Sequence, residues 1–396
     1  MGLMRKCLQL AVAGIAITAL GGCVSPIALD HAVVQYDTTT ADSVSKQLLL
    51  NIARSRHDQP IHFTAVSSIA ATYRFNVTAG LLPAATGDRG SLAVPTFGTI
   101  AEENPTISIA PMQGDEFTQR LLTPFPEQKL SLLLSQDYDV DSLLRLMASE
   151  VRLQDASGQI VDNLNRPSDR EGYTVFRKVM AHLSSVQDRH ALKVQLLDFQ
   201  ITWTVPAATM TPEAFGTTYK DYSLTFDAAK SVYHVSKRVG DRVMICNYDP
   251  ESLSSEERFK LHAEAESAPA NDVLLDIRPG HPGGEYPMHG WLRLRSFHEI
   301  LTFIGRGMAE EPEFDVAPDP RTPNITENPA HIIEVTESTS PPPGHELSVQ
   351  WQGKYYALRD ETGYQWNKKA FSLLYQLFQM SVAPVGQTGP AITISK

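Results

Sequence analysis

His281, Glu285 and His289 carry the side chains of this sequence that are best suited to metal chemistry. They are spaced four residues apart, and on a helix that spacing would place them on one face. Imidazole and carboxylate groups are usual zinc ligands, but a closed site needs a fourth ligand, which this spacing does not supply. Pro282 and Pro287 oppose a helix. The sequence therefore favours a solvent-exposed loop over a metal site, and we expect no cofactor.

Three aspartates at alternate positions, Asp137, Asp139 and Asp141, match the start of a calcium-binding loop. Such a loop needs a glycine at its sixth position and a carboxylate at its twelfth. Those positions hold Ser142 and Ala148, so the pattern fails. Acidic residues also favour helix N-termini, and the sequence indicates helix capping ahead of the leucines that follow.

No catalytic signature is complete. Ser43 and Lys46 match the S-x-x-K element of penicillin-binding enzymes, but the accompanying S-D-N and K-T-G elements do not occur. The sequence also has no G-x-S-x-G, Walker A or G-x-G-x-x-G motif. We predict no catalytic residue and favour a non-enzyme, although a catalytic set dispersed along the chain would leave no such motif.

Two arginines beside a tryptophan form a further candidate site. Arg293 and Arg295, next to Trp291, are suited to binding an anionic sugar or a phosphate. The alternation of apolar and basic residues equally predicts an edge strand with one charged face, which we favour.

Hydrophobic periodicity predicts an α+β fold, with several amphipathic helices in the N-terminal part, a β-rich middle and a C-terminal hairpin plus helix. We expect an extended leader over residues 24–40 and a helix over 42–52 that begins at a capping aspartate. Alternation predicts a strand over 66–77, and Gly, Pro, Thr and Ala then indicate a loop or weak hairpin over 80–105. Residues 113–151 are helical by pattern, with breaks at two prolines.

The middle of the chain contains a predicted helix start and several strands. Ser168 and Glu171 match a capping box. Alternation over 192–205 changes phase once, as a β-bulge would cause. Residues 232–238 and 242–248 flank a turn and predict a hairpin.

The C-terminal part combines a proline-rich stretch with a final hairpin and an amphipathic helix. The proline-rich stretch indicates a linker or a long surface excursion. The expected organisation is a signal segment over 1–22, a mixed helical and strand region over 23–165, an α+β core over 166–309, the proline-rich excursion over 310–345, the hairpin and helix over 346–380, and a tail over 381–396.

The N-terminal segment has the three-part layout of an export signal. Arg5 and Lys6 precede an uncharged, mostly apolar stretch from Leu8 to Leu20, which as a helix rises only about 20 Å and cannot span a hydrocarbon core of about 30 Å. Leu20-Gly21-Gly22-Cys23 follows, with small residues directly before a cysteine. This segment resembles the type II signal peptide and lipobox of bacterial lipoproteins. An ordinary secretory signal with a cysteine at this place by chance is the alternative.

The resemblance implies that Cys23 becomes the first mature residue. Its thiol would carry a diacylglyceryl group and its amino group a further acyl chain, which together give stable anchoring. Val24 stands where an aspartate would retain the protein in the inner membrane, so the resemblance implies the outer membrane, with the body in the periplasm. Cys246 is then the one free thiol, in an apolar run that predicts a buried strand.

Composition limits the class of partner. The chain has 396 residues and a formal net charge of −11, which opposes nucleic-acid binding through a basic surface. Its body is also similar to a group of uncharacterised proteobacterial outer-membrane lipoproteins, through the stretch from Pro105 to Gly114, the leucine-rich helices after it, and the final hairpin plus helix. That similarity implies no activity and no binding residues.

We therefore expect a lipid-anchored, non-enzymatic envelope scaffold, or an accessory subunit of a surface or secretion assembly, with an envelope protein as its partner. A periplasmic hydrolase acting on cell-wall or polysaccharide material is one alternative. A glycan-binding or small-ligand-binding protein is another.

Overall fold

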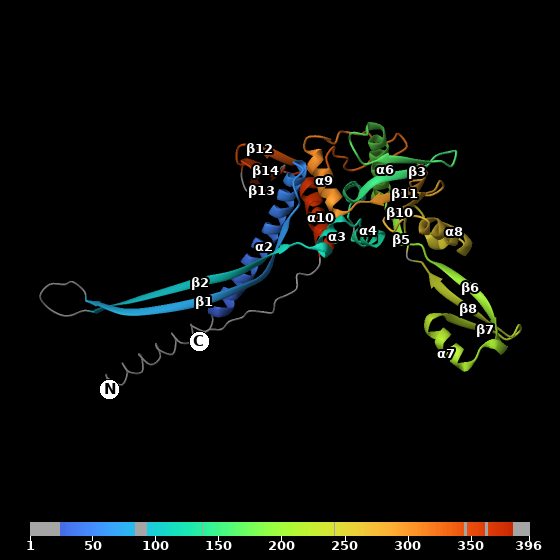
Figure 1. The fold of residues 1–396 in the computed structure, drawn as a ribbon, viewed down its shortest axis with the longest axis horizontal. Coiled ribbons are helices and arrows are strands. Elements are labelled where there is room, and N and C mark those ends of the chain that lie inside the picture. Colours follow the sequence, from blue (N-terminus) through green and yellow to red (C-terminus); the bar gives the residue numbers. More distant parts are fainter. Residues whose placement is uncertain are drawn as a thin grey trace. The chain divides into compact units, whose positions relative to one another are not determined.

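The computed structural model has an α+β fold, as the sequence predicts (Figure 1). The structure describes residues 24–83, 93–136, 138–240, 242–343, 347–360 and 363–382. The chain divides into two compact units, of which unit 1 comprises Met1–Gln47, Ile61–Phe117 and Val382–Lys396, and unit 2 comprises Leu48–Pro60 and Thr118–Ser381. Cys23 lies outside the described residues. Within the described ranges, no helix combines the length and the apolar character needed to cross a membrane.

Helix α2 (Val24–Arg56) starts in unit 1 and ends in unit 2. The expected extended leader over 24–40 is wrong, because these residues belong to this helix, and Asp42 lies inside it rather than at its cap. The sequence has no proline or glycine between Pro26 and Pro60, so nothing interrupts the backbone hydrogen bonds. The hydroxyls of Thr38 and Thr39 donate back to main-chain oxygens four residues earlier and so do not compete with the helix.

Unit 1 also contains a long antiparallel hairpin of β1 (Phe63–Pro83) and β2 (Ala93–Met112). Their register runs from Phe63↔Met112 to Pro83↔Ala93, with one irregularity near Ser68. The predicted strand over 66–77 is confirmed as part of β1. Of the two predictions for residues 80–105, the loop is wrong for 80–83 and 93–105, and the hairpin is confirmed for these residues, because they pair with each other and with the rest of β1 although their own β-propensity is low.

Unit 2 is built on a six-stranded sheet with the order β4-β3-β11-β10-β9-β5. β9 and β10 are parallel, and the other neighbours are antiparallel. The strands are β3 (Ala148–Gln154), β4 (Ile160–Leu164), β5 (Lys193–Leu196), β9 (Val243–Cys246), β10 (Asp272–Ile277) and β11 (Met288–Leu294). Its strands come from both the 23–165 and the 166–309 regions, so these regions share one sheet.

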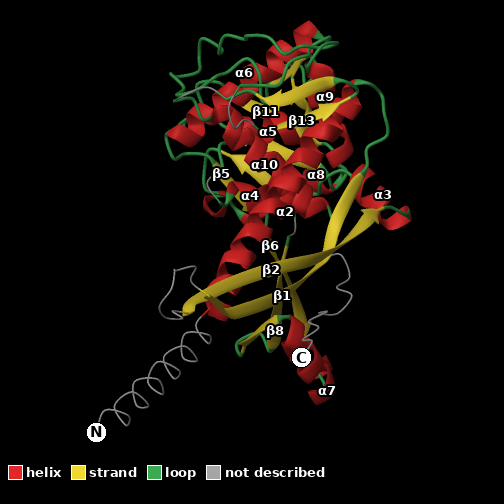
Figure 2. Ribbon diagram, turned by 90° about the vertical axis from the view of Figure 1, so that its left-hand side faces the viewer, coloured by secondary structure: helices red, strands yellow, loops and turns green. Residues whose placement is uncertain are grey.

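Most helices of unit 2 lie around its large sheet (Figure 2). They are α3 (Asp115–Leu122, which begins in unit 1), α4 (Glu127–Leu134), α5 (Val140–Met147), α6 (Arg170–Asp188), α8 (Ser255–Glu266), α9 (Phe297–Gly307) and α10 (Trp366–Ser381). The leucine-rich stripes of α5 and α10 are buried, as their periodicity predicts. Val151, expected on a helical face, lies in β3, because α5 ends at Met147 and the backbone becomes extended at Ala148.

Local sequence signals fix several helix starts. Asp139 caps α5 by accepting a hydrogen bond from the Ser142 amide, which confirms the capping interpretation of that aspartate. For α6 the expected capping box at Ser168 is wrong by one residue, because Asp169 is the cap and accepts from the amide of Gly172. A carboxylate is a good cap in its own right, so Asp169 caps the helix although Gly172, three residues on, cannot complete a capping box.

Two three-stranded sheets complete unit 2. The first has the order β6-β8-β7, with β6 (Phe199–Pro206), β7 (Ser223–Asp227), β8 (Val232–Val239), the short helix η1 (Ala207–Thr209) and α7 (Pro212–Asp221). The second has the order β12-β14-β13, with β12 (Val335–Ser338), β13 (Ser348–Trp351) and β14 (Lys354–Leu358), and it contains the predicted final hairpin. The short helix η2 (Pro250–Ser252) precedes α8.

Two predicted strand pairings are wrong because the chain changes sheets. The phase change after Leu196 is not a bulge but the passage from β5 in the large sheet to β6 in a small one. Residues 232–238 and 242–248 do not form a hairpin, because β8 pairs with β6 and β7, whereas β9 pairs with β10 and β5. Gly240 lies between β8 and β9, where the chain passes from one sheet to the other. A Cβ atom added there would be 2.2 Å from the Leu197 carbonyl oxygen, so only glycine fits.

Candidate functional site

The structure does not bring His281, Glu285 and His289 together. The ring of His281 packs against Tyr248, with 5.5 Å between ring centroids, and Glu285 forms an ion pair with Arg189 at 3.1 Å. His289 lies between Asp276 and Glu264, at 3.1 and 2.7 Å. Across the described part of the chain, no three His, Cys, Asp or Glu side chains are grouped so that they could hold a metal ion.

The two carboxylates around His289 predict a pH-dependent stability. Hydrogen bonds to Asp276 and Glu264 raise the pKa of His289 to about 9, despite its partial burial. Because the pKa is raised above its unfolded value, this contribution to stability is complete below about pH 6.5 and is lost as the pH rises through about 9. We expect the difference in unfolding free energy between wild type and His289→Gln, measured in urea, to be large at pH 6 and small at pH 10. A difference that does not change with pH would contradict this.

The other residues singled out by sequence have structural contacts. Asp141 lies 3.5 Å from Arg145, and Asp137 lies outside the described residues. Ser43 and Lys46 lie within α2. The Cys246 side chain is buried and donates to the Tyr248 carbonyl, and burial raises the pKa of its thiol to about 12, so it is not an activated nucleophile.

The predicted strand at Trp291–Arg293 is confirmed, but its expected edge position is wrong. β11 lies between β3 and β10 inside the large sheet. Arg293 forms ion pairs with Asp272 at 3.0 Å and Glu150 at 2.9 Å, so it is held by carboxylates. Arg295 follows the strand and lies in a different environment.

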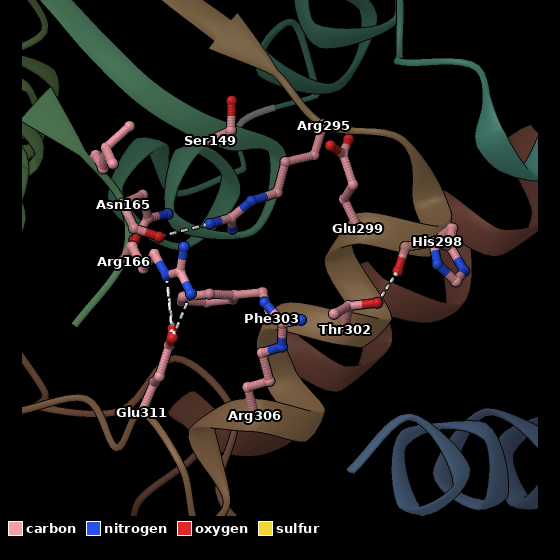
Figure 3. Close-up of a pocket in the computed structure, with 11 residues that line it drawn as sticks. Ser149, Asn165, Arg166, Arg295, His298, Glu299, Thr302, Phe303, Arg306 and Glu311 are labelled. Atoms are coloured by element: carbon pink, nitrogen blue, oxygen red, sulfur yellow. Dashed lines mark hydrogen bonds and ion pairs between the residues drawn. The ribbon is translucent and has the colours of Figure 1, made fainter. Parts of the chain in front are cut away.

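Arg295 lines a cavity of about 400 Å³, which is large enough for a small ligand. The cavity lies between the ends of β3 and β4, helix α9 and the segment after it (Figure 3). Its lining residues are Ser149, Leu164, Asn165, Arg166, Arg295, His298, Glu299, Thr302, Phe303, Arg306 and Glu311.

Arg295 is a buried cation held by neutral groups. Its guanidinium donates to the main-chain oxygens of Arg145, Leu146 and Asn165 at 3.2, 3.3 and 2.8 Å, and lies 4.0 Å from the centroid of the Phe303 ring. Within the described ranges, no carboxylate forms an ion pair with it. Burial lowers the pKa of Arg295 to about 10, so it stays charged at neutral pH.

The two carboxylates of the cavity are already engaged. Arg166 donates to both oxygens of Glu311 at 2.8–3.2 Å. Glu299 accepts from the amide of Ser296 at 2.7 Å and completes the capping box of α9. The side chain of Arg306 forms no hydrogen bond or ion pair with any described residue. Among the described residues, no carboxylate forms an ion pair with Arg295 or Arg306, although Glu299 acts on the charge of Arg295 and Glu311 on that of Arg306 from a longer distance.

The hydroxyls of the cavity are not arranged for nucleophilic chemistry. Ser149 donates to the carbonyl of Arg293 at 3.2 Å, and Thr302 donates to the carbonyl of His298 at 2.9 Å. Figure 3 shows the His298 ring turned away from Arg166 and Arg306. A nucleophile needs a base within hydrogen-bond reach, so the geometry suits the binding of an anion rather than its conversion.

Of the residues that line this cavity, the sequence predicts only Arg295 as a candidate binding residue. It paired Arg295 with Arg293 as neighbours in the chain, whereas the structure joins it with Arg166 and Arg306 from other elements. No local motif connects these residues. Comparison with known protein families, with curated proteins and with solved structures finds no match.

Proposed function

We propose that the protein is a lipid-anchored, non-enzymatic subunit of an outer-membrane assembly, held to the periplasmic leaflet by acyl chains on Cys23. The signal-like segment that ends at Cys23 supports the anchor, as described above. The observation that carries the assembly role is that, among the residues of unit 1 whose burial the structure describes, only one side chain is buried.

The side chains of unit 1 whose burial the structure describes are mostly exposed or half-buried. Within residues 33–47, 61–66 and 107–117, Phe63 is the one buried side chain. Val33 and Val34 of α2 are 58% and 59% exposed, and Ile109 of β2 is 66% exposed. A two-stranded sheet is marginally stable alone in water, and exposed apolar side chains that gather on one element favour a partner. Unit 1 is therefore suited to association.

Two substitutions at apolar residues of similar exposure test this role. We expect Ile109→Asp, in unit 1, to shift the protein extracted from envelopes in mild detergent to a smaller particle in sedimentation. Leu132→Asp is the matched control, because Leu132 is 56% exposed but belongs to α4 in unit 2. If the wild-type protein is extracted without any partner, or if both variants behave alike, the assembly role is wrong.

The cavity at Arg295 supports small-anion binding as a second function. Two cations without carboxylate partners favour a phosphate or carboxylate group, and arginine suits such groups by its geometry. This function is compatible with an assembly role, because the cavity lies wholly in unit 2.

Arg306→Gln is expected to weaken phosphate binding by about tenfold to a hundredfold, because a charge-assisted hydrogen bond contributes about 1.5–3 kcal/mol. The measurement is isothermal titration of inorganic phosphate. Lys260→Gln provides a control, since Lys260 is an exposed cation on α8. Equal affinity of Arg306→Gln and wild type would exclude this site.

A further inference from the structure

The hairpin of β1 and β2 has two long outer edges. In the described part of the chain each strand pairs only with the other. In an antiparallel ladder every second residue directs its N–H and C=O groups away from the neighbouring strand. Each edge therefore presents a row of donors and acceptors that another strand can bind.

Prolines identify which residues of β2 face outward. Pro95, Pro105 and Pro111 have no N–H to donate, so their positions lie outside the β1–β2 hydrogen bonds. Their partners in the register are Leu81, Ala71 and Thr64. The three β1 residues opposite the prolines therefore also direct their N–H and C=O groups outward. On each strand, the residues that alternate with the inward-facing ones from these positions form the outer edge.

A contact at the base of the hairpin supports this assignment. The amide of Thr64 donates to the side-chain oxygen of Gln47 at 2.7 Å, and the side-chain nitrogen of Gln47 donates to the Thr64 carbonyl at 3.0 Å. Both main-chain groups of Thr64 thus point away from β2 and are bound as a neighbouring strand would bind them. On the outer edge of β1, the residues from Ile69 onward lie further along the strand than the contact between Thr64 and Gln47.

The outer edges of β1 and β2 differ in how well they are protected against pairing with a further strand. Three prolines interrupt the outer edge of β2, which also contains Glu103, and Glu102 is a second charged residue of that strand. The outer edge of β1 from Ile69 to Leu81 contains no proline, and Arg74 is the one charged residue in that stretch. Prolines and charges are the usual protection of edge strands, so β1 has the edge open to pairing.

We propose that β1 of one copy pairs antiparallel with β1 of a second copy, edge to edge, across a twofold axis. This inference deepens the proposed assembly role, on which it rests, by naming the first partner. An antiparallel edge is complementary to itself, because its alternating donors and acceptors match those of an identical strand turned by 180°. The resulting four-stranded sheet ends at a β2 edge on both sides, where prolines oppose the addition of further strands.

Two alanine-to-proline substitutions distinguish the edges. Ala71→Pro removes an outward N–H from β1 and leaves the hairpin bonds intact, because Ala71 already pairs with Pro105. Ala101→Pro makes the same change on the outer edge of β2, since Ala101 is in phase with Pro105. Circular dichroism of both variants checks that the fold is kept.

The masses of the mature full-length proteins in detergent, measured by sedimentation, provide the test. We expect a dimer for wild type and for Ala101→Pro, and a dimer dissociation constant at least tenfold higher for Ala71→Pro. A wild-type monomer at micromolar concentration would overturn the inference, as would an equal effect of both substitutions. If that monomer still occurs in a larger complex in envelope extracts, the assembly role stands and its partner is another protein.

Hydrogen exchange of the wild-type protein gives a second readout that needs no variant. Peptides from β1 should exchange more slowly when the protein concentration is raised, whereas peptides from β2 should not. Equal concentration dependence of the two strands, or none, would also overturn β1–β1 pairing.

Discussion

Arg145→Ala is expected to lower the free energy of unfolding by about 3–5 kcal/mol, which is the usual cost of removing one partner of a buried ion pair. Arg145 is fully buried and donates to Glu313 at 2.8 Å and to the carbonyls of Pro329 and Ala330 at 2.9 and 2.7 Å. Its loss leaves the Glu313 carboxylate buried beside fewer cations. Urea unfolding at pH 7 measures the change.

This cluster explains why residues 311–334, the part of the proline-rich stretch that has no helix or strand, pack against α5 and α6 within unit 2. Glu313 also accepts from the Tyr173 hydroxyl and the Ile332 amide, and Arg177 donates to the Ala330 carbonyl. Burial is the largest single effect on the pKa of Glu313 and raises it, but the charges of Arg145 and Arg177 and the hydrogen bonds from Arg145 and the Ile332 amide together outweigh burial and hold that pKa below its usual value. The segment is thus fixed to α5 and α6 by charged side chains.

Arg166→Ala is the control for this prediction. The Arg166–Glu311 pair is about half exposed on the arginine side, and such pairs contribute about 0–1 kcal/mol. If Arg145→Ala destabilised the protein no more than Arg166→Ala, the buried cluster would not be what holds the segment in place.

Cys23→Ser is expected to abolish incorporation of labelled palmitate and to remove the protein from the outer-membrane fraction. Each buried CH₂ group of an acyl chain contributes about 0.8 kcal/mol, and several chains anchor stably where one is marginal. The proposed removal of the signal segment with Arg5 and Lys6 would change the formal charge from −11 to −13, so attraction to anionic lipid would not replace the chains.

Cys246→Ser is the matched control, because Cys246 is a buried thiol in β9. This variant should keep both the label and the location. Palmitate incorporation that survives in Cys23→Ser would show that the anchor lies elsewhere or is absent.

Predictions from the sequence are confirmed for elements that are encoded by a local pattern. They are wrong where pairing with a strand elsewhere in the chain decides the structure. The leucines of α5 and α10, the apolar run before Cys246 and the final hairpin are local patterns, and the structure confirms them. Residues 93–105 carry no strong strand signal of their own and become a strand by pairing with β1. The passages between sheets after Leu196 and Val239 left only a phase change in the sequence, which a bulge or a hairpin explains equally well.

The candidate site was less predictable than the fold. Arg166, Arg295 and Arg306 converge because α9 begins directly after β11 and returns past the end of β4, and no spacing in the chain encodes that approach. The sequence offers His289 as a candidate metal ligand through its spacing from His281 and Glu285. Its actual neighbours are the carboxylates of Asp276 in β10 and Glu264 in α8, which that spacing does not indicate.

The buried Cys246 thiol makes this chain convenient for selective labelling. A maleimide reacts with a thiolate, and a thiol with a pKa of about 12 and no solvent exposure is unreactive while the sheet is closed. In the mature protein that we propose, without Cys7 and with Cys23 acylated, a cysteine introduced on the surface would therefore accept a fluorophore without removal of Cys246. Slow modification of Cys246 itself would then report how often β9 opens to solvent.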